Sequence, residues 1–290
     1  MIDLRKLITD KTPIINLDDS NYVSKEEKEK AIGLSVDSFI LNNYLTNMYF
    51  KDGKWYYFKN NKEKDFPFGY MDELLGSYLS QERNLQTVRY NVAKVSDTYG
   101  LASVNFKTSD NIYLLLTDIL KDDTDPLGLM TLGLTKLEIL KNCTINEENK
   151  YAFLNHLFDL FALDIYMLQK DRCNVNLQFM QNKKTGYFDL APIYDYELCG
   201  SRVSEFGIEI PSRIVSLYYD TIIELAKKYP IFYEKLKFCL EQNMAETWDI
   251  ICDDYCFNKD TSEYERIMDY YEVKDKRQKK YIREMISHVK

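Results

Sequence analysis

Two aspartates and one asparagine in the middle of the chain have the residue types and the spacing that phosphate chemistry requires. Four residues separate Asp171 from Asn176, and Asp195 follows after a short segment of strand-like pattern. Phosphoryl transfer needs a carboxylate that orients the attacking hydroxyl and accepts its proton, together with hard oxygen ligands for Mg²⁺. Such residues are also common in turns and helix caps. The spacing therefore has to be judged by the elements that surround it.

Those elements place the three residues in a defined order. Apolar residues recur every three or four positions from about 149 to 169, which predicts an amphipathic helix that ends just before Asp171. A turn at 183–186, which contains Gly186, separates two short runs and indicates a hairpin that ends before Asp195. The expected layout is a helix, a polar loop, a short hairpin and then a carboxylate.

The first third of the chain has a different character. Two aromatic-rich runs between 47 and 59 flank Asp52-Gly53, which predicts a β-hairpin whose second strand ends at Lys59. A helix with a charged surface is expected from 70 to 83, with Glu73 in its first turn. Two further alternating runs, 88–95 and 101–106, predict an antiparallel pair.

From about residue 112 onward the pattern is mainly helical. Helices are expected near 214–225, 231–243 and 262–288. Together with the strand-rich first part, this predicts an α+β fold of two lobes. The expected division is a small antiparallel-sheet N-lobe over residues 1–110 and a helical C-lobe over residues 111–290.

The composition and the charge of the chain disfavour several classes of protein. A net charge of -8 disfavours a long nucleic-acid interface, and we interpret the basic run at 274–280 as a solvated helix face. No apolar run is long enough for a signal peptide or a membrane span, so we expect a cytoplasmic protein without membrane contact. The six cysteines show no metal-binding spacing, and we expect reduced thiols. We interpret His156 as a helix residue, not a base.

Two segments carry a resemblance to a known family. The first reads DRCNVN at 171–176, and the second reads YFDLAPIYDYE at 187–197. Together they resemble the HipA-like serine/threonine kinases, whose C-terminal lobe has a D-x-H-x-x-N loop followed by an L-A-P-x-Y-D segment. The resemblance covers most of residues 45–290, strongly at 160–200 and loosely elsewhere, and it implies a two-lobed protein-kinase-like fold.

The resemblance also implies roles for five residues. Asp171 would be the catalytic base, and Asn176 and Asp195 would hold Mg²⁺ against the phosphates of ATP. Lys59 would contact the α- and β-phosphates and form an ion pair with Glu73.

The sequence also contains rivals and departures from the family pattern. Lys51 and Lys54 compete with Lys59, and Glu82 competes with Glu73. Cys173 replaces the loop histidine of the family, and the candidate phosphate-binding stretch, 35–46, lacks glycine.

These observations leave three hypotheses. The first is an ATP- and Mg²⁺-dependent kinase that phosphorylates serine or threonine in a protein substrate. The second is a pseudokinase that keeps the fold as a scaffold, and the third is a kinase-like phosphotransferase acting on a small molecule. Within the first, the resemblance implies a toxin that is neutralised by an antitoxin-type protein partner.

Overall fold

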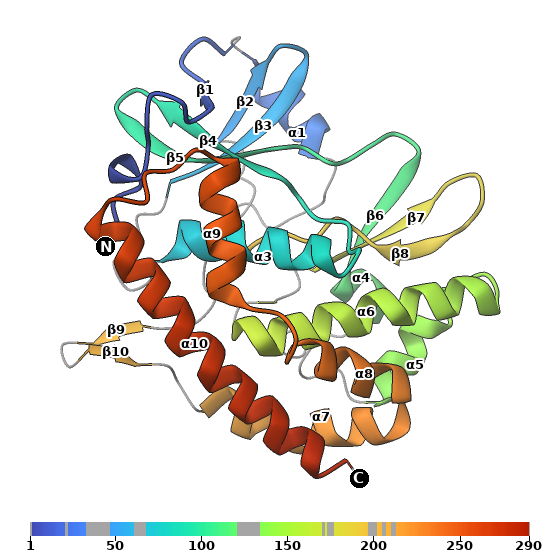
Figure 1. Ribbon diagram of the computed structural model, residues 1–290. Coiled ribbons are helices and arrows are strands. Elements are labelled where there is room, and N and C mark those ends of the chain that lie inside the picture. Colours follow the sequence, from blue (N-terminus) through green and yellow to red (C-terminus); the bar gives the residue numbers. More distant parts are fainter. Residues whose placement is uncertain are drawn as a thin grey trace.

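The structure is a computed structural model with an α+β architecture of two lobes (Figure 1). It describes residues 2–20, 23–32, 47–60, 68–120, 134–169, 172, 177–196, 202–204, 207–209 and 213–289. A five-stranded sheet forms one lobe, at the top of Figure 1, and most of the described helices form the other. The predicted division at residues 110 and 111 stays a prediction.

The sheet of the first lobe has the strand order β1-β4-β5-β3-β2. Its strands are β1 (Ile14–Asn16), β2 (Met48–Lys51), β3 (Lys54–Lys59), β4 (Tyr90–Val95) and β5 (Thr98–Val104). The β2–β3 hairpin confirms the prediction, and Asp52 and Gly53 at its turn both have positive φ, which two-residue hairpin turns require. The β4–β5 pair is antiparallel as predicted. The parallel pairing of β1 with β4 was not predicted.

Helix α3 (Gly69–Glu82) lies under this sheet and contacts β4, α6 and α9 (Figure 1). The prediction of a helix is confirmed, but the prediction that its charged residues face solvent was wrong for Asp72 and Glu73. Nearly every residue of α3 is buried, and these residues include Asp72 and Glu73. A helix that is covered on all sides must find partners for its acidic side chains inside the protein.

A second sheet joins the lobes, with the order β6-β7-β8. Its strands are β6 (Asn111–Leu115), β7 (Gln178–Asn182) and β8 (Phe188–Leu190). The β7–β8 hairpin was predicted. The helical interpretation from residue 112 was wrong at its start, because 111–115 pair with the distant strand β7. Pairing with a remote strand outweighs the local pattern in such short runs.

The remaining elements are largely helical. They are η1 (Leu4–Lys6), α1 (Lys25–Ile32), α4 (Leu116–Leu120), α5 (Leu134–Lys141), α6 (Glu147–Met167), β9 (Arg202–Ser204), β10 (Gly207–Glu209), α7 (Arg213–Lys228), α8 (Pro230–Phe238), α9 (Met244–Asp254) and α10 (Ser262–Ser287). Helix α6 confirms the predicted central helix, begins after the capping residue Asn146 and packs against α8, α10 and β8. Helices α7, α8 and α10 were predicted, whereas α9 was not. No helix in the described ranges is apolar over a length that would cross a membrane.

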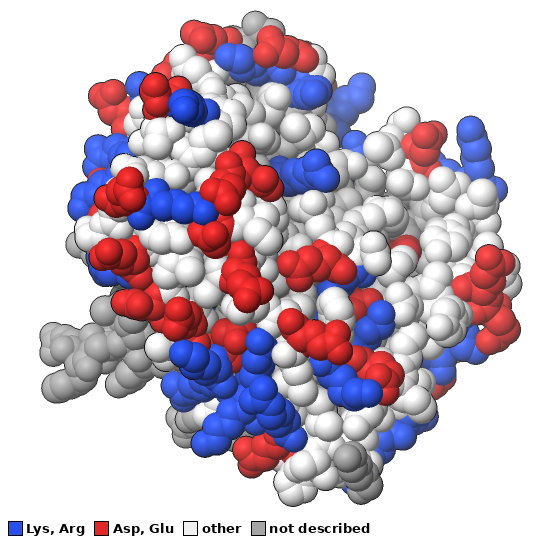
Figure 2. Space-filling model, in the orientation of Figure 1, with Lys and Arg blue, Asp and Glu red and all other residues white. Residues whose placement is uncertain are grey.

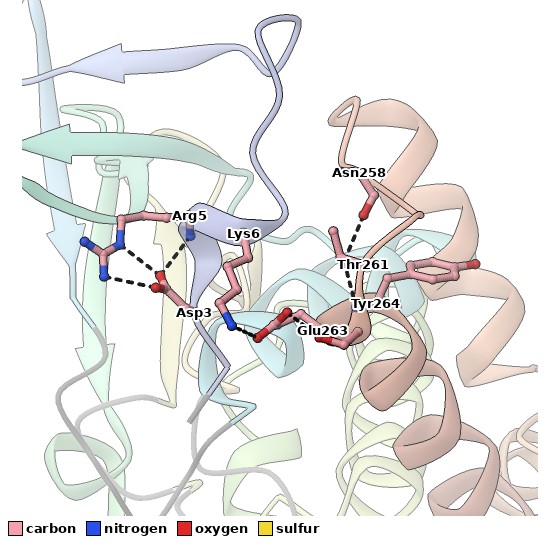
Figure 3. A network of polar contacts seen from close by, with 8 residues as sticks. Asp3, Arg5, Lys6, Asn258, Thr261, Glu263 and Tyr264 are labelled. Atoms are coloured by element: carbon pink, nitrogen blue, oxygen red, sulfur yellow. Dashed lines mark hydrogen bonds and ion pairs between the residues drawn. The ribbon is translucent and has the colours of Figure 1, made fainter.

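The first residues of the chain fasten the two lobes together. Lys6 Nζ lies 2.5 Å from Glu263 Oε1 at the start of α10, and Leu7 O accepts a hydrogen bond from the Asn258 amide (2.7 Å). Figure 3 shows this end of α10, where Thr261 caps the helix. A few residues later, β1 joins the sheet of the other lobe. We call residues 2–16 the N-terminal strap.

The basic run at 274–280 differs in part from its predicted role. Figure 2 shows acidic side chains spread over the face that α9 and α10 form, with basic ones gathered over the C-terminal half of α10. Lys274, however, is fully buried: its Nζ donates to Asp72 Oδ1 on α3 (3.0 Å) and lies over the rings of Tyr270 and Tyr271. The burial of Asp72 raises its pKa to about 6, although Lys274 acts in the opposite direction.

We predict that Lys274→Met destabilises the protein by about 3–5 kcal/mol, because it leaves the Asp72 carboxylate buried without its cationic partner. The measurement is the free energy of unfolding from urea denaturation. The double variant Asp72→Asn/Lys274→Met is expected to recover most of the loss, since both charges are then absent. If the single and the double variant lose equal stability, the pair is not the cause.

Candidate functional site

A cavity of about 340 Å³ lies between the five-stranded sheet and the segment that follows β8. This volume is at the lower end of the range for small-ligand pockets. The cavity is lined by Asn47, Met48, Tyr57, Phe58, Lys59, Asn60, Val88, Tyr90, Ser103, Val104, Asn105, Phe106, Lys107, Gln178, Tyr194 and Asp195. Two of the residues singled out in the sequence, Lys59 and Asp195, are therefore in its wall.

Lys59 is the last residue of β3, where it pairs with Leu101 of β5. The strands approach closely here because β5 has a glycine at the neighbouring position. A Cβ atom on Gly100 would lie 2.2 Å from Lys59 O. The Lys59 ammonium is paired with Glu73 Oε1 and lies 2.6 Å from Asp195 Oδ1. Its side chain is 12% exposed, so this cation sits in a largely dry environment between two carboxylates.

Glu73 connects this ammonium to the segment that contains Asp195. While Oε1 pairs with Lys59, Oε2 accepts a hydrogen bond from the Tyr196 amide (2.9 Å). The Glu73 side chain is 1% exposed. Both oxygens therefore have partners, which a buried carboxylate needs.

Asp195 has a left-handed backbone conformation, with φ of 70°. Aspartate tolerates this region better than most residues, and such backbone strain persists where the surroundings hold it. The Asp195 amide donates to Tyr90 Oη (3.4 Å), and its carbonyl accepts from Gln169 Nε2 just after α6. The side chain is 25% exposed, and Asp195 lines the cavity while its Oδ1 contacts Lys59.

Arg172 is a site residue that sequence reasoning missed. Its guanidinium makes two hydrogen bonds to the Asp164 carboxylate on α6 (3.0 and 3.1 Å) and one to Tyr194 O (2.6 Å). It also lies over the Tyr196 ring, 4.8 Å from the centroid. Arg172 thus ties the residues on both sides of Asp195 to the central helix. The sequence did contain a signal for this pair: Asp164 is an acidic residue within an apolar run, and a buried acid needs a partner.

Tyr90 is buried beside Lys59, Glu73 and Asp195. Its burial, reinforced by the negative charge of Glu73, raises the pKa of the phenol well above its ordinary value. The hydroxyl therefore stays protonated and can accept from the Asp195 amide while keeping its own proton.

The structure brings together three of the five predicted site residues: Lys59, Glu73 and Asp195. Asp171 and Asn176 lie outside the described residues, as do Cys173 and the stretch 35–46. Within the described ranges, no group of three or more His, Cys, Asp and Glu side chains is arranged to hold a metal.

The rival residues lie outside the cavity lining. Lys51 Nζ donates to Asn16 O (2.6 Å), and Lys54 is exposed on the hairpin. Glu82 accepts hydrogen bonds from Gln242 (2.8 Å) and Thr247 (3.1 Å) of the other lobe. His156 is in α6, as predicted, where Nδ1 lies 2.8 Å from Asp189 Oδ2.

Comparison with known proteins identifies similar folds among solved structures. No family model matches the sequence, and no curated protein does. Among solved structures, the proinflammatory kinase CtkA of Helicobacter pylori superposes with a TM-score of 0.62 at 13% identity, covering 96% of this chain and 99% of CtkA. HipA of Shewanella oneidensis MR-1, solved with HipB and operator DNA, gives 0.58 at 8% identity, covering 84% of this chain and 64% of HipA. The chain has the HipA-like kinase fold, which confirms the resemblance at the level of the fold.

We predict that Gly76→Val destabilises the protein by about 1–3 kcal/mol, because a Cβ at this position would lie 2.3 Å from the Tyr196 ring. Displacement of Tyr196 would also break its amide contact with Glu73. Gln81→Val, which places valine at a half-buried position of the same helix, is the control for introducing a β-branched residue into α3. Thermal unfolding of both variants is the measurement, and equal losses would contradict the steric explanation.

Proposed function

We propose that this chain is an ATP- and Mg²⁺-dependent serine/threonine protein kinase. The observation that supports the proposal most directly is the position of Lys59. Its ammonium lies between Glu73 and Asp195, in the wall of a cavity between the lobes of a HipA-like kinase fold. A cation held by one buried acid beside a second, part-exposed acid suits the binding of phosphates and a divalent metal.

In the proposed mechanism, each residue has one task. Lys59 binds the α- and β-phosphates of ATP, and Glu73 keeps its ammonium in place. Asp195, which lines the cavity, would hold Mg²⁺ together with Asn176. Asp171 accepts the proton of the attacking hydroxyl. A Mg²⁺ ion held by these residues would supply positive charge against the phosphates during transfer.

We further propose that the acceptor is a protein and that the kinase acts as a toxin restrained by an antitoxin-type protein. The similarity to HipA, which was solved in complex with HipB, supports this partner. The pseudokinase remains the alternative, because Cys173 replaces the family's histidine.

We predict that ATP binds only in the presence of Mg²⁺ and that Asp195→Ala weakens this binding at least tenfold, because it removes the proposed metal ligand. Isothermal titration calorimetry with and without Mg²⁺ is the measurement. Asp97→Ala, which changes an exposed aspartate of the same type in the β4–β5 turn, is the control and should bind as the wild type does. Metal-independent binding, or equal affinities of the two variants, would count against the assignment.

Transfer of label from γ-labelled ATP to the protein itself or to a lysate protein tests turnover. We predict labelling by the wild type and a loss of at least 100-fold with Asp171→Asn, which removes the proposed base. The same pair tests the toxin proposal, since only the wild type should arrest growth when it is expressed. ATP binding without any label transfer would favour the pseudokinase.

A further inference from the structure

One side of helix α10 is exposed along most of its length. The exposed residues between 265 and 284 recur mainly at spacings of three and four, which places them on one face of the helix. At about 100° per residue, they fall within a stripe about 120° wide. We call this set the α10 stripe, and it consists of Glu265, Arg266, Asp269, Glu272, Val273, Lys276, Lys280, Arg283 and Glu284.

The charges along the middle of the α10 stripe are separated into an acidic half and a basic half. Three acids and then three bases follow one another at helical spacing: Glu265, Asp269, Glu272, Lys276, Lys280 and Arg283. Figure 2 shows the same separation on the surface, with acidic side chains over α9 and α10 and basic ones over the C-terminal half of α10. Like charges three or four residues apart destabilise an isolated helix. This order is therefore unfavourable for a single copy of α10.

The dipole of the helix does not account for this order. It favours acids at the N-terminus and bases at the C-terminus, but its effect falls off within the first and the last turn. Helix α10 spans Ser262–Ser287, so Asp269, Glu272, Lys276 and Lys280 lie outside these two turns. The ion pair between Glu272 and Lys276 (3.3 Å) joins two exposed side chains, and such a pair stabilises a helix only slightly.

The α10 stripe is complementary to itself when a second copy lies antiparallel to it. Residues of opposite charge are placed symmetrically about a centre at positions 274–275: Glu265 with Arg283, Arg266 with Glu284, Asp269 with Lys280, and Glu272 with Lys276. A two-fold axis at this centre brings each residue opposite the second member of its pair in the other copy. Every charge of the α10 stripe then faces an opposite charge.

The pairs also agree in their direction around the helix. Across such an axis each edge of the α10 stripe faces the same edge of the other copy, so both members of a pair must lie on one side of α10. Glu265 and Arg283 are 18 residues apart, as are Arg266 and Glu284, and 18 residues make five whole turns. The last two residues are exceptions to the separation of acids and bases, and the symmetry accounts for them as well.

An apolar side chain is exposed at the centre of the α10 stripe. Val273 is 58% exposed, and the two-fold axis places it beside the same residue of the second copy. Next to it, Glu272 and Lys276 border a groove between α9 and α10. Helix α9 contributes to this groove an exposed apolar residue, Ile250, and a further acid, Glu246. The groove thus enlarges the surface that the second copy can contact.

We propose that the α10 stripe, with the adjoining groove, is the interface of a symmetric homodimer in which the two α10 helices lie antiparallel. The partner is a second copy of this chain. The α10 stripe is about 28 Å long and about 10 Å wide. This footprint is smaller than the roughly 800 Å² per partner of a typical stable complex, so the dimer has a micromolar dissociation constant and depends on ionic strength. The inference does not rest on the proposed function, and it is tested without nucleotide.

We predict that the wild type forms a dimer reversibly as its concentration is raised, and that added salt weakens the association. Glu265→Lys/Asp269→Lys and Lys280→Glu/Arg283→Glu each place like charges opposite one another, so each variant alone should associate at least about tenfold more weakly. An equimolar mixture of the two variants should dimerise again, because every changed residue then faces an opposite charge. Sedimentation velocity over a range of protein concentrations is the measurement.

Asp97→Lys/Glu148→Lys is the matched control, since it changes the net charge by the same amount at two exposed positions outside α9 and α10. It should associate as the wild type does, after circular dichroism has shown that each protein is folded. A wild type that stays monomeric at every concentration overturns the inference and leaves this face to solvent or to a different partner. Self-association that the two charge variants leave unchanged also overturns it, because the dimer then uses another surface. Recovery in the mixture supports the inference, since mixing would not repair variants that were merely misfolded.

Discussion

The ammonium of Lys59 lies between the carboxylates of Glu73 and Asp195, and this arrangement requires three distant parts of the chain to meet. The groups come from β3, from α3 and from the segment after β8. Because Lys59 and Glu73 are largely removed from water, separating these two leaves a buried charge without its partner, at a cost of several kcal/mol. The close contact of β3 with β5 and the burial of α3 are therefore conditions for the site.

Helix α3 has two adjacent acids with different partners. Glu73 pairs with Lys59 of the sheet, whereas Asp72 pairs with Lys274 of α10 in the helical lobe. Successive residues of a helix point about 100° apart, so one rotation of α3 would break both pairs. Gly76 adds a steric limit, since the Tyr196 ring fills the space beside it. The orientation of α3 is thus determined by both lobes together.

Features that depend on neighbouring residues could be predicted from the sequence, while those that depend on remote partners could not. The turn at 52–53 and the position of Asp195 after a hairpin follow from a few adjacent residues. Lys274 was assigned to an exposed face because its partner, Asp72, is 202 residues away. The contribution of Arg172 to the site depends on where α6 ends relative to the segment after β8, which local pattern does not determine.

The N-terminal strap has a consequence for the order in which the molecule can form. Its residues leave the ribosome before the helical lobe is made, yet Lys6 pairs with Glu263, 257 residues later in the chain, and Thr9 with the Cys256 carbonyl, 247 residues later. During synthesis these contacts are unavailable until Cys256 and Glu263 have emerged. The strap is therefore made long before the partners that hold it, and a nascent chain that stops before Cys256 lacks all of these contacts.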